Sequence, residues 1–117
     1  MKFRLLGGAP ALPRRLLFVA SMVFIGTVVS VDGAQPKTHT IRIHEMKFDP
    51  ASLEINVGDT VIWRNDDIVP HTATSRGSFD SRGIDPGKTW EHVADKKGAY
   101  VYICAYHPTM KAALAVR

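Results

Sequence analysis

The sequence is poor in cysteine: among its 117 residues, Cys104 is the single one. A single cysteine cannot form an intrachain disulfide. It is therefore a partner in an intermolecular bridge, an inert buried hydrophobe, or a thiol with a chemical task of its own. The apolar share of 45% is ordinary for a globular protein and sufficient for a hydrophobic core, and the length fits one domain.

An excess of charge of one sign is also lacking in most of the chain. Four of the 15 basic residues precede Leu16, and from Gln35 onward 11 Lys and Arg residues face 10 Asp and Glu residues. This net charge of about +1 says little about partners. No basic patch with interleaved aromatic residues occurs in this region, so nucleic-acid binding is disfavoured.

The N-terminus has the composition of an export signal. A basic region precedes the apolar run Leu16 to Val31, and small residues follow it. This order is typical of a signal peptide with a cleavage site after the apolar run. We therefore expect residues 1–34 to be a signal peptide, cleaved near residues 30–35, and residues 35–117 to form the mature domain.

The leader allows other interpretations. An uncleaved membrane anchor is disfavoured because the apolar run is shorter than the roughly 20 apolar residues that a spanning helix needs. The pair Arg14-Arg15 is a weak indication of twin-arginine export. A lipid-modified N-terminal cysteine is excluded, because the sole cysteine is Cys104.

After residue 35 the sequence predicts short strands separated by turns. Residues 40–44 and 53–57 alternate between apolar and polar types, which indicates strands with one buried face. Residues 60–65 are rich in β-formers and include Trp63, a large ring suited to the middle of a sandwich. Residues 76–83 are polar and predict a loop. Strands of this length, without a convincing amphipathic helix, indicate an all-β fold, an antiparallel β-sandwich of Greek-key type. The remaining predicted strands are residues 71–75, 89–94, 100–104 and 113–116.

The residues with distinctive chemistry lie in one short stretch, Cys104-Ala105-Tyr106-His107-Pro108-Thr109-Met110. A thiolate, an imidazole and a thioether stand there at positions i, i+3 and i+6, and a second imidazole, His71, lies 33 residues before Cys104. Thiolate and thioether sulfur favour Cu(I), imidazole suits both oxidation states, and two His with one Cys and a weak axial Met is the blue-copper arrangement. The set therefore predicts copper, although a zinc site of Cys-His-His type is chemically possible.

The local structure expected around this stretch brings the donors together. Cys104 ends a predicted strand whose side-chain alternation points it between the sheets. The loop that follows turns His107 and Met110 back toward the same point. Pro108 fixes one φ angle there, so little freedom remains for the loop to open.

Motifs along residues 41–116 agree with a copper site. Through them the chain resembles the cupredoxins, which are type 1 blue copper proteins, and within them the small periplasmic amicyanin-like and plastocyanin-like subgroup. The Cys-x2-His-x2-Met spacing is that of the amicyanin-like loop, the shortest in the family. Two positions depart from it, since amicyanin-like loops usually carry Pro at Tyr106 and Gly at Ala112. The motifs are Met46-Lys47-Phe48-Asp49-Pro50, Val57-Gly58-Asp59-Thr60-Val61-Ile62-Trp63-Arg64-Asn65, Pro70-His71-Thr72, Pro86-Gly87, Gly98-Ala99-Tyr100-Val101-Tyr102-Ile103-Cys104 and His107-Pro108-Thr109-Met110-Lys111.

The resemblance implies a site with one type 1 copper ion per chain. His71, Cys104 and His107 would be its three strong ligands, and Met110 would be a weak axial contact that tunes the redox potential. The hydroxyl of Thr72 would tether the ligand loop. The imidazole edge of His107 would reach the surface through an apolar patch, where a redox partner docks. We expect this patch to comprise Val69, Pro70, Tyr106, Pro108 and Ala112.

The function expected from these features is one-electron transfer in the periplasm. A site that keeps the same four ligands in both oxidation states needs little reorganisation and no catalytic pocket. By resemblance, the partners are redox proteins, a periplasmic dehydrogenase or a cytochrome. We expect a monomer that makes no contact with nucleic acid and no stable contact with a membrane after processing.

Two other classes of function share some of these features. A copper-binding or delivery protein would have the same ligands, but such carriers usually expose Met-rich or His-rich surface sites. An oxidase would need further copper ligands, and no Ser/His/Asp or paired-carboxylate arrangement stands out. We therefore expect no enzymatic activity.

Several other polar residues carry no predicted task. His39, His44 and His92 have no ligand partner at a suitable spacing. The pairs Asp66-Asp67 and Lys96-Lys97 are interpreted as solvated turns.

Overall fold

The computed structural model describes residues 7–13, 15, 19–29, 33 and 35–117. The chain divides into two units, Met1–Asp32 and Gly33–Arg117. Where the first unit is described, it has no regular secondary structure. The rest of the expected signal peptide, including Arg14 of the twin-arginine pair, lies outside the described residues. No helix within the described ranges has the length and apolar character needed to cross a membrane.

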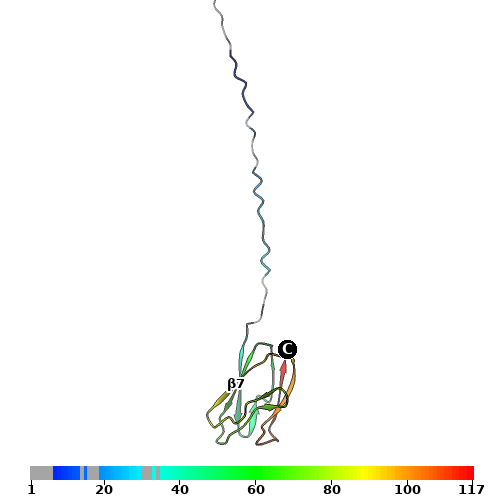
Figure 1. Ribbon diagram of the computed structural model, residues 1–117. Coiled ribbons are helices and arrows are strands. Elements are labelled where there is room, and N and C mark those ends of the chain that lie inside the picture. The colour runs from blue at the N-terminus through cyan, green and yellow to red at the C-terminus, as the bar shows by residue number, and fades with distance from the viewer. Residues whose placement is uncertain (1–6, 14, 16–18, 30–32, 34) are drawn as a thin grey trace, which may run out of the picture. The chain divides into compact units, whose positions relative to one another are not determined.

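The second unit is built from two β-sheets (Figure 1). One sheet has the strand order β2-β1-β4-β7, and the other has the order β3-β9-β8-β5-β6. The last two long strands, β8 and β9, are antiparallel neighbours and appear in orange and red in Figure 1. The strands are β1 (Thr38–His44), β2 (Lys47–Asp49), β3 (Ser52–Ile55), β4 (Thr60–Asn65), β5 (Thr74–Ser75), β6 (Phe79–Asp80), β7 (Thr89–Val93), β8 (Gly98–Ile103) and β9 (Lys111–Val116).

The predicted all-β sandwich is confirmed, with one difference in the direction of pairing. β1 lies parallel to β4, with Thr38 opposite Thr60, and β3 lies parallel to β9, with Ser52 opposite Ala113. The other strand pairs are antiparallel. Side chains alternate with a period of two in both arrangements, so local patterning cannot distinguish them.

The segment around the first predicted histidine ligand differs from the strand expected at residues 71–75. His71 forms an isolated bridge with Ile84, and regular pairing begins at β5. The intervening N–H groups of Thr72 and Ala73 donate instead to side-chain acceptors, Cys104 Sγ and a serine hydroxyl. The loop expected over residues 76–83 also contains the short strand β6, which pairs with β5.

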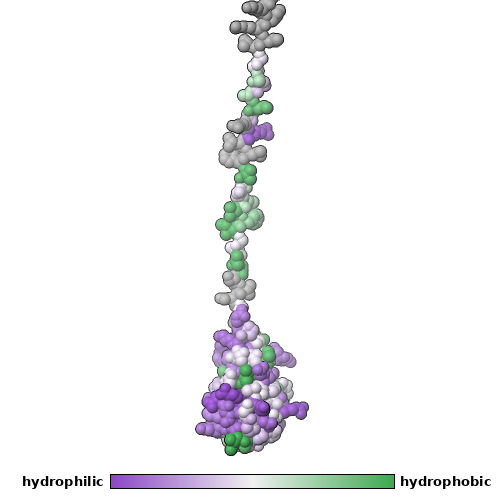
Figure 2. All heavy atoms as spheres, turned by 90° about the vertical axis from the view of Figure 1, so that its left-hand side faces the viewer, coloured by the Kyte–Doolittle hydropathy of each residue, from purple (hydrophilic) through white to green (hydrophobic). Residues whose placement is uncertain are grey.

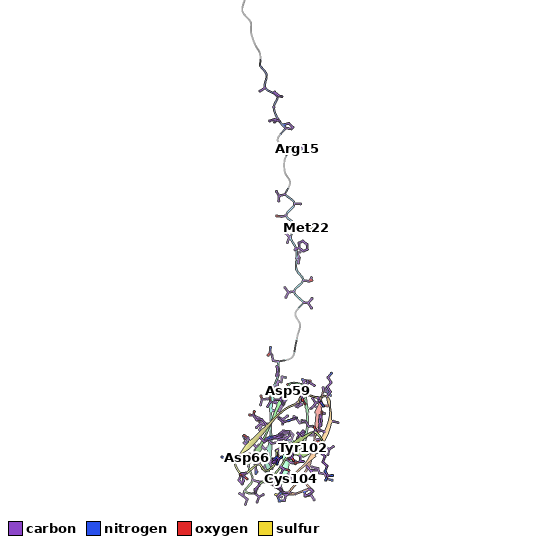
Figure 3. All side chains as sticks on the ribbon, viewed as in Figure 1. Arg15, Met22, Asp59, Asp66, Tyr102 and Cys104 are labelled. Atoms are coloured by element: carbon purple, nitrogen blue, oxygen red, sulfur yellow. The ribbon has the colours of Figure 1, made fainter. Side chains whose placement is uncertain are left out.

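The core is centred on Trp63, which has no exposed surface. Its ring lies 5.5 Å from that of Tyr102 in an edge-to-face arrangement, 5.5 Å from Phe79 and 5.4 Å from Trp90. Aromatic pairs at these separations add to the stabilisation from buried area. The prediction that Trp63 fills the middle of the sandwich is thus confirmed, and Figure 3 shows Tyr102 between the two ends of the domain.

A buried carboxylate ties the start of the domain to the sheet. Asp59 accepts hydrogen bonds from the N–H groups of Lys37, at 2.9 Å, and Asn56, at 3.1 Å, and its other partner is His39 Nε2, at 2.9 Å. The N–H of Lys37, then His39 and the N–H of Asn56, lower the pKa of Asp59 from 3.8 to about 2. Ionised Asp59 therefore stabilises the fold.

This carboxylate predicts a specific loss of stability in acid. Because the pKa of Asp59 is about 2 in the fold and 3.8 ordinarily, its contribution is fully present above pH 3.8 and declines as the pH falls through 2. Asp59→Asn should lower the free energy of unfolding at neutral pH, and it should flatten the dependence of stability on pH in that window. Urea unfolding of both proteins as a function of pH measures this. Parallel curves for wild type and variant would contradict it.

Candidate metal centre

The predicted donor residues lie in two loops at one end of the domain. His71 follows β4, and its backbone is held to Ile84 by two hydrogen bonds, His71 N–H to Ile84 O at 3.1 Å and Ile84 N–H to His71 O at 2.7 Å. Cys104 directly follows β8, and the loop from Cys104 to Met110 leads into β9. Figure 3 shows Cys104 toward the end of the domain opposite Asp59.

The structure brings three of the predicted donors together. The Nδ1 atoms of His71 and His107 each lie 3.7 Å from Cys104 Sγ. All three donor atoms lie within 4.8 Å of one another. His71 and Cys104 are completely buried, whereas His107 is partly exposed. A thiol and two imidazoles thus face a common point that is accessible from one side.

The donor separations fit a shared metal ion better than direct hydrogen bonds. A trigonal ion with bonds of about 2.3 Å to sulfur and about 2.0 Å to nitrogen would place these two atoms about 3.7 Å apart. The two Nδ1 to Sγ distances are 3.7 Å. A soft thiolate with two imidazoles is also the donor set that suits copper.

The loop after Cys104 is closed by its own backbone. His107 N–H donates to Cys104 O at 3.3 Å, Met110 N–H donates to His107 O at 2.9 Å, and Cys104 N–H donates to Met110 O at 3.1 Å. These bonds return the chain to its starting point within seven residues. Met110 is 4% exposed, so its thioether lies in the interior at the base of the loop. The four predicted residues are thus positioned as in a type 1 copper site.

Thr72 joins the two loops. Its N–H donates to Cys104 Sγ at 3.3 Å, and its hydroxyl accepts a hydrogen bond from Ala105 N–H at 2.7 Å. The predicted tether between Thr72 and the ligand loop is therefore confirmed. The N–H donor also lies where it can stabilise negative charge on the sulfur.

Sequence reasoning missed Asn65, which braces the loop that carries His71. Its side chain is fully buried, and its Nδ2 donates to Val69 O and to Ile84 O, both at 2.8 Å. Its Oδ1 accepts the N–H of Asp67 at 2.9 Å. The signal in the sequence was the position of Asn65, a polar residue at the end of the predicted strand 60–65, two residues after the buried Trp63 and on the same face.

The interpretation of Asp66-Asp67 as a solvated turn holds for Asp66, which is exposed, and is wrong for Asp67. Asp66 is paired with Arg42 at 2.7 Å and with Arg64 at 3.0 Å. Asp67 contacts His71 Nε2 at 2.8 Å, and its side chain is 15% exposed. Burial acts to raise the pKa of Asp67, but the donors Met46 N–H, His71 and Glu45 N–H together keep it below the ordinary value. Asp67 is thus a carboxylate against a predicted metal ligand.

Of the five residues expected in the apolar patch, three are exposed, Val69 is partly buried and Ala112 is buried. Tyr106 is 56% exposed, and Pro70 and Pro108 are exposed. The inclusion of Ala112 was wrong: it is 7% exposed, because the alternation of β9 turns it toward the core. Ile68, which was not predicted, is 93% exposed in the loop before His71. Figure 2 shows a hydrophobic group at this end of the domain.

Comparison with known proteins points in the same direction. The family model described as "Cupredoxin-like domain" matches residues 15–116. Amicyanin-alpha of Methylorubrum extorquens is 28% identical over 97 residues, which is 78% of this chain and 82% of the relative. The structure of a purple cupredoxin from Nitrosopumilus maritimus has a TM-score of 0.62 and 33% identity, covering 68% of this chain and 99% of that one.

A copper-containing nitrite reductase from Thermus scotoductus SA-01 is also similar in structure. It has a TM-score of 0.66 and 30% identity over 71% of this chain. This chain spans only 23% of the reductase, so the similarity concerns one part of a larger protein.

The tether by Thr72 predicts a measurable contribution to stability. Thr72→Val keeps the shape of the side chain but leaves Ala105 N–H without its acceptor. We expect the free energy of unfolding of the metal-free protein to fall by about 1–2 kcal/mol. Chemical denaturation measures this change. Thr40→Val, at an exposed position of β1, is the matched control and should change stability by no more than about 0.5 kcal/mol. Equal effects of the two substitutions would contradict a specific tether.

Proposed function

Because the chain belongs to the cupredoxin-like domain family, we propose that it carries single electrons by means of one type 1 copper ion. His71, Cys104 and His107 are the three strong ligands in this proposal, and Met110 is the weak axial one. The observation that supports it most directly is the pair of 3.7 Å distances from Cys104 Sγ to the two Nδ1 atoms. His71 comes from one loop, and Cys104 and His107 come from another that begins 33 residues later. One ion bound to all three atoms would explain why the two distances are equal.

The properties of the surrounding residues suit electron transfer. The bound ion would supply a one-electron couple. The chain holds the donors in place through the backbone bonds of the ligand loop and through Thr72, so a change in charge at the site need not move them. A geometry that is similar in both oxidation states keeps the reorganisation small.

Exposure around the site defines where an electron would pass. His71 and Cys104 are fully buried, and the partly exposed ring of His107 offers the shortest route to solvent. The exposed side chains of Tyr106 and Ile68 flank the site in sequence and offer apolar contact. A small apolar surface of this kind suits a transient partner, which must dissociate after each transfer. We infer that the partners are other redox proteins.

The alternative function, copper binding or delivery without electron transfer, is less well supported. A protein that hands over its metal needs ligands that a receiver can reach. Here two of the three strong donors, His71 and Cys104, have no exposed surface. The similarity to a nitrite reductase covers 23% of that enzyme, so its reaction is not part of the proposal.

The proposed division of the chain places residues 1–34 in a periplasmic export signal and residues 35–117 in the mature protein. Lys37, just after this point, is held in the fold, because its N–H donates to Asp59 and its carbonyl accepts Thr60 N–H at 2.9 Å. Cleavage near residues 30–35 would leave these contacts intact.

Cleavage at this point predicts the mass of the exported protein. Expression in a Gram-negative host followed by periplasmic extraction should yield a species that starts between residues 30 and 36, as measured by intact-mass spectrometry. A species that retains residue 1 and stays in the membrane fraction would favour an uncleaved anchor.

The copper proposal predicts the properties of the purified protein. It should bind one copper ion per chain, show the intense visible absorption of a copper thiolate, and show a narrow hyperfine splitting in its paramagnetic resonance spectrum. Cys104→Ser should abolish the absorption while the far-ultraviolet circular dichroism is unchanged, because the thiolate is the source of the colour. A variant that stays blue would refute the ligand assignment.

Two further measurements separate the alternatives. Competition between zinc and copper for the purified protein measures which metal binds more tightly. A preference for zinc, with no colour, would identify a zinc site. Reversible voltammetry with retained metal supports a carrier, whereas rapid loss of copper to a chelating acceptor supports delivery.

A further inference from the structure

One carboxylate connects the ring of His71 to a distant turn. Asp67 Oδ2 lies 2.8 Å from His71 Nε2, the ring nitrogen remote from Cys104. The same carboxylate accepts the N–H of Glu45 on Oδ1 at 2.7 Å and the N–H of Met46 on Oδ2 at 3.1 Å. Asp67 therefore has three hydrogen-bond partners in two separate parts of the chain.

The turn that Asp67 holds has a backbone that side chains disfavour. Glu45 and Met46 lie between the paired residues His44 and Lys47 at the end of the β1–β2 hairpin. Their φ angles are 53° and 58°, in the left-handed region. Two-residue turns with positive φ at both positions normally contain Asn and Gly. A carboxylate that accepts both N–H groups compensates for the unfavourable residues, and it fixes the turn against the loop that carries Asp67.

The contact with Asp67 also determines which nitrogen of His71 carries the proton. An ionised carboxylate only accepts hydrogen bonds, so His71 Nε2 must be the N–H donor. In the neutral ring Nδ1 then keeps its lone pair, and this is the atom that lies 3.7 Å from Cys104 Sγ. Asn65 supports the arrangement from behind, because its Oδ1 accepts Asp67 N–H at 2.9 Å.

We propose that Asp67 is a positioning residue that holds His71 as the Nε2-protonated tautomer and couples the orientation of its ring to the β1–β2 turn. The tautomer is a property of the metal-free protein. Its consequence for copper rests on the proposed function: a carboxylate that accepts the distal N–H makes the imidazole a stronger donor, and this favours Cu(II) over Cu(I). Loss of such a partner typically weakens metal binding about 10–100-fold.

The first test uses the metal-free protein. Long-range proton–nitrogen correlation spectra of the wild type should show His71 as a single tautomer with the proton on Nε2. In Asp67→Asn the amide cannot accept from all three donors, so we expect a mixture of tautomers or faster exchange of the ring proton, and the same in Asp67→Ala. Asp66→Asn is the matched control, because Asp66 pairs with Arg42 and Arg64 rather than with His71, and it should leave the His71 signals unchanged.

The second test uses the copper-loaded protein. If Asp67→Asn weakens Cu(II) binding about tenfold more than Cu(I) binding, the reduction potential rises by about 59 mV. Asp66→Asn should not produce this rise. An accompanying change in the copper hyperfine splitting of the Asp67 variants would show that the ligand geometry has changed.

The outcomes separate this inference from the proposed function. An Nδ1-protonated His71 in the wild type, which needs no variant to fold, overturns the inference. The inference is also overturned if the Asp67 variants show the same His71 tautomer and the same reduction potential as the wild type. In that case the copper proposal still stands, provided that the wild-type protein is blue. A wild type that binds no copper but shows the Nε2-protonated ring overturns the copper proposal and supports the positioning role of Asp67.

Discussion

The hydrogen bonds of Thr72 are the constraint on which the site depends. Thr72 directly follows His71. Its N–H donates to Cys104 Sγ in the other loop, and its hydroxyl accepts a hydrogen bond from Ala105 N–H there. Because Thr72 and His71 are neighbours, the same two bonds that join the loops also limit the distance between the His71 ring and the Cys104 sulfur. Regular β-pairing is interrupted between His71 and β5, because the N–H groups of Thr72 and Ala73 donate to side chains there. Backbone groups that would complete a ladder serve the site instead.

The site is therefore a continuation of the sandwich. β8 delivers Cys104 on the inward face, directly beyond the aromatic core of Trp63 and Tyr102, and β9 begins where the ligand loop ends. The two histidines differ in how they are held. His71 is buried, its Nε2 contacts Asp67 and its backbone is bonded to Ile84, whereas His107 lies in a short loop and is partly exposed. The histidine with more hydrogen-bond partners is thus the buried one, and His107 is the more accessible of the two.

The sequence was most informative where spacing and chemistry coincide. The spacing of Cys104 and His107, together with His71, predicted the cluster that the structure brings together. The β-rich composition of residues 60–65 and the size of the Trp63 ring predicted its buried position. The parallel pairings could not be predicted, because local patterning is the same for both strand directions. These pairings depend on how the sandwich closes.

The residues that contact the predicted ligands without being ligands themselves were harder to predict from the sequence. Asp67 was interpreted as solvated, because an Asp-Asp pair in a loop gives no sign of the two distant N–H groups that it accepts. Its partners, Glu45 and Met46, are more than 20 positions away and are unusual residues for a turn of their type. Polar contacts of this kind depend on tertiary proximity alone. Three of the four predicted donors, Cys104, His107 and Met110, belong to a short local motif, whereas the residues that orient His71 do not.

The position of Lys37 has a consequence for access to the protein. Lys37 is bonded to Asp59, and Asp59 and Cys104 lie at opposite ends of the domain (Figure 3). Any segment that stays attached ahead of Lys37 therefore joins the domain at the pole remote from His107. A change in the residues that immediately precede Lys37 therefore acts on the end of the domain opposite Cys104.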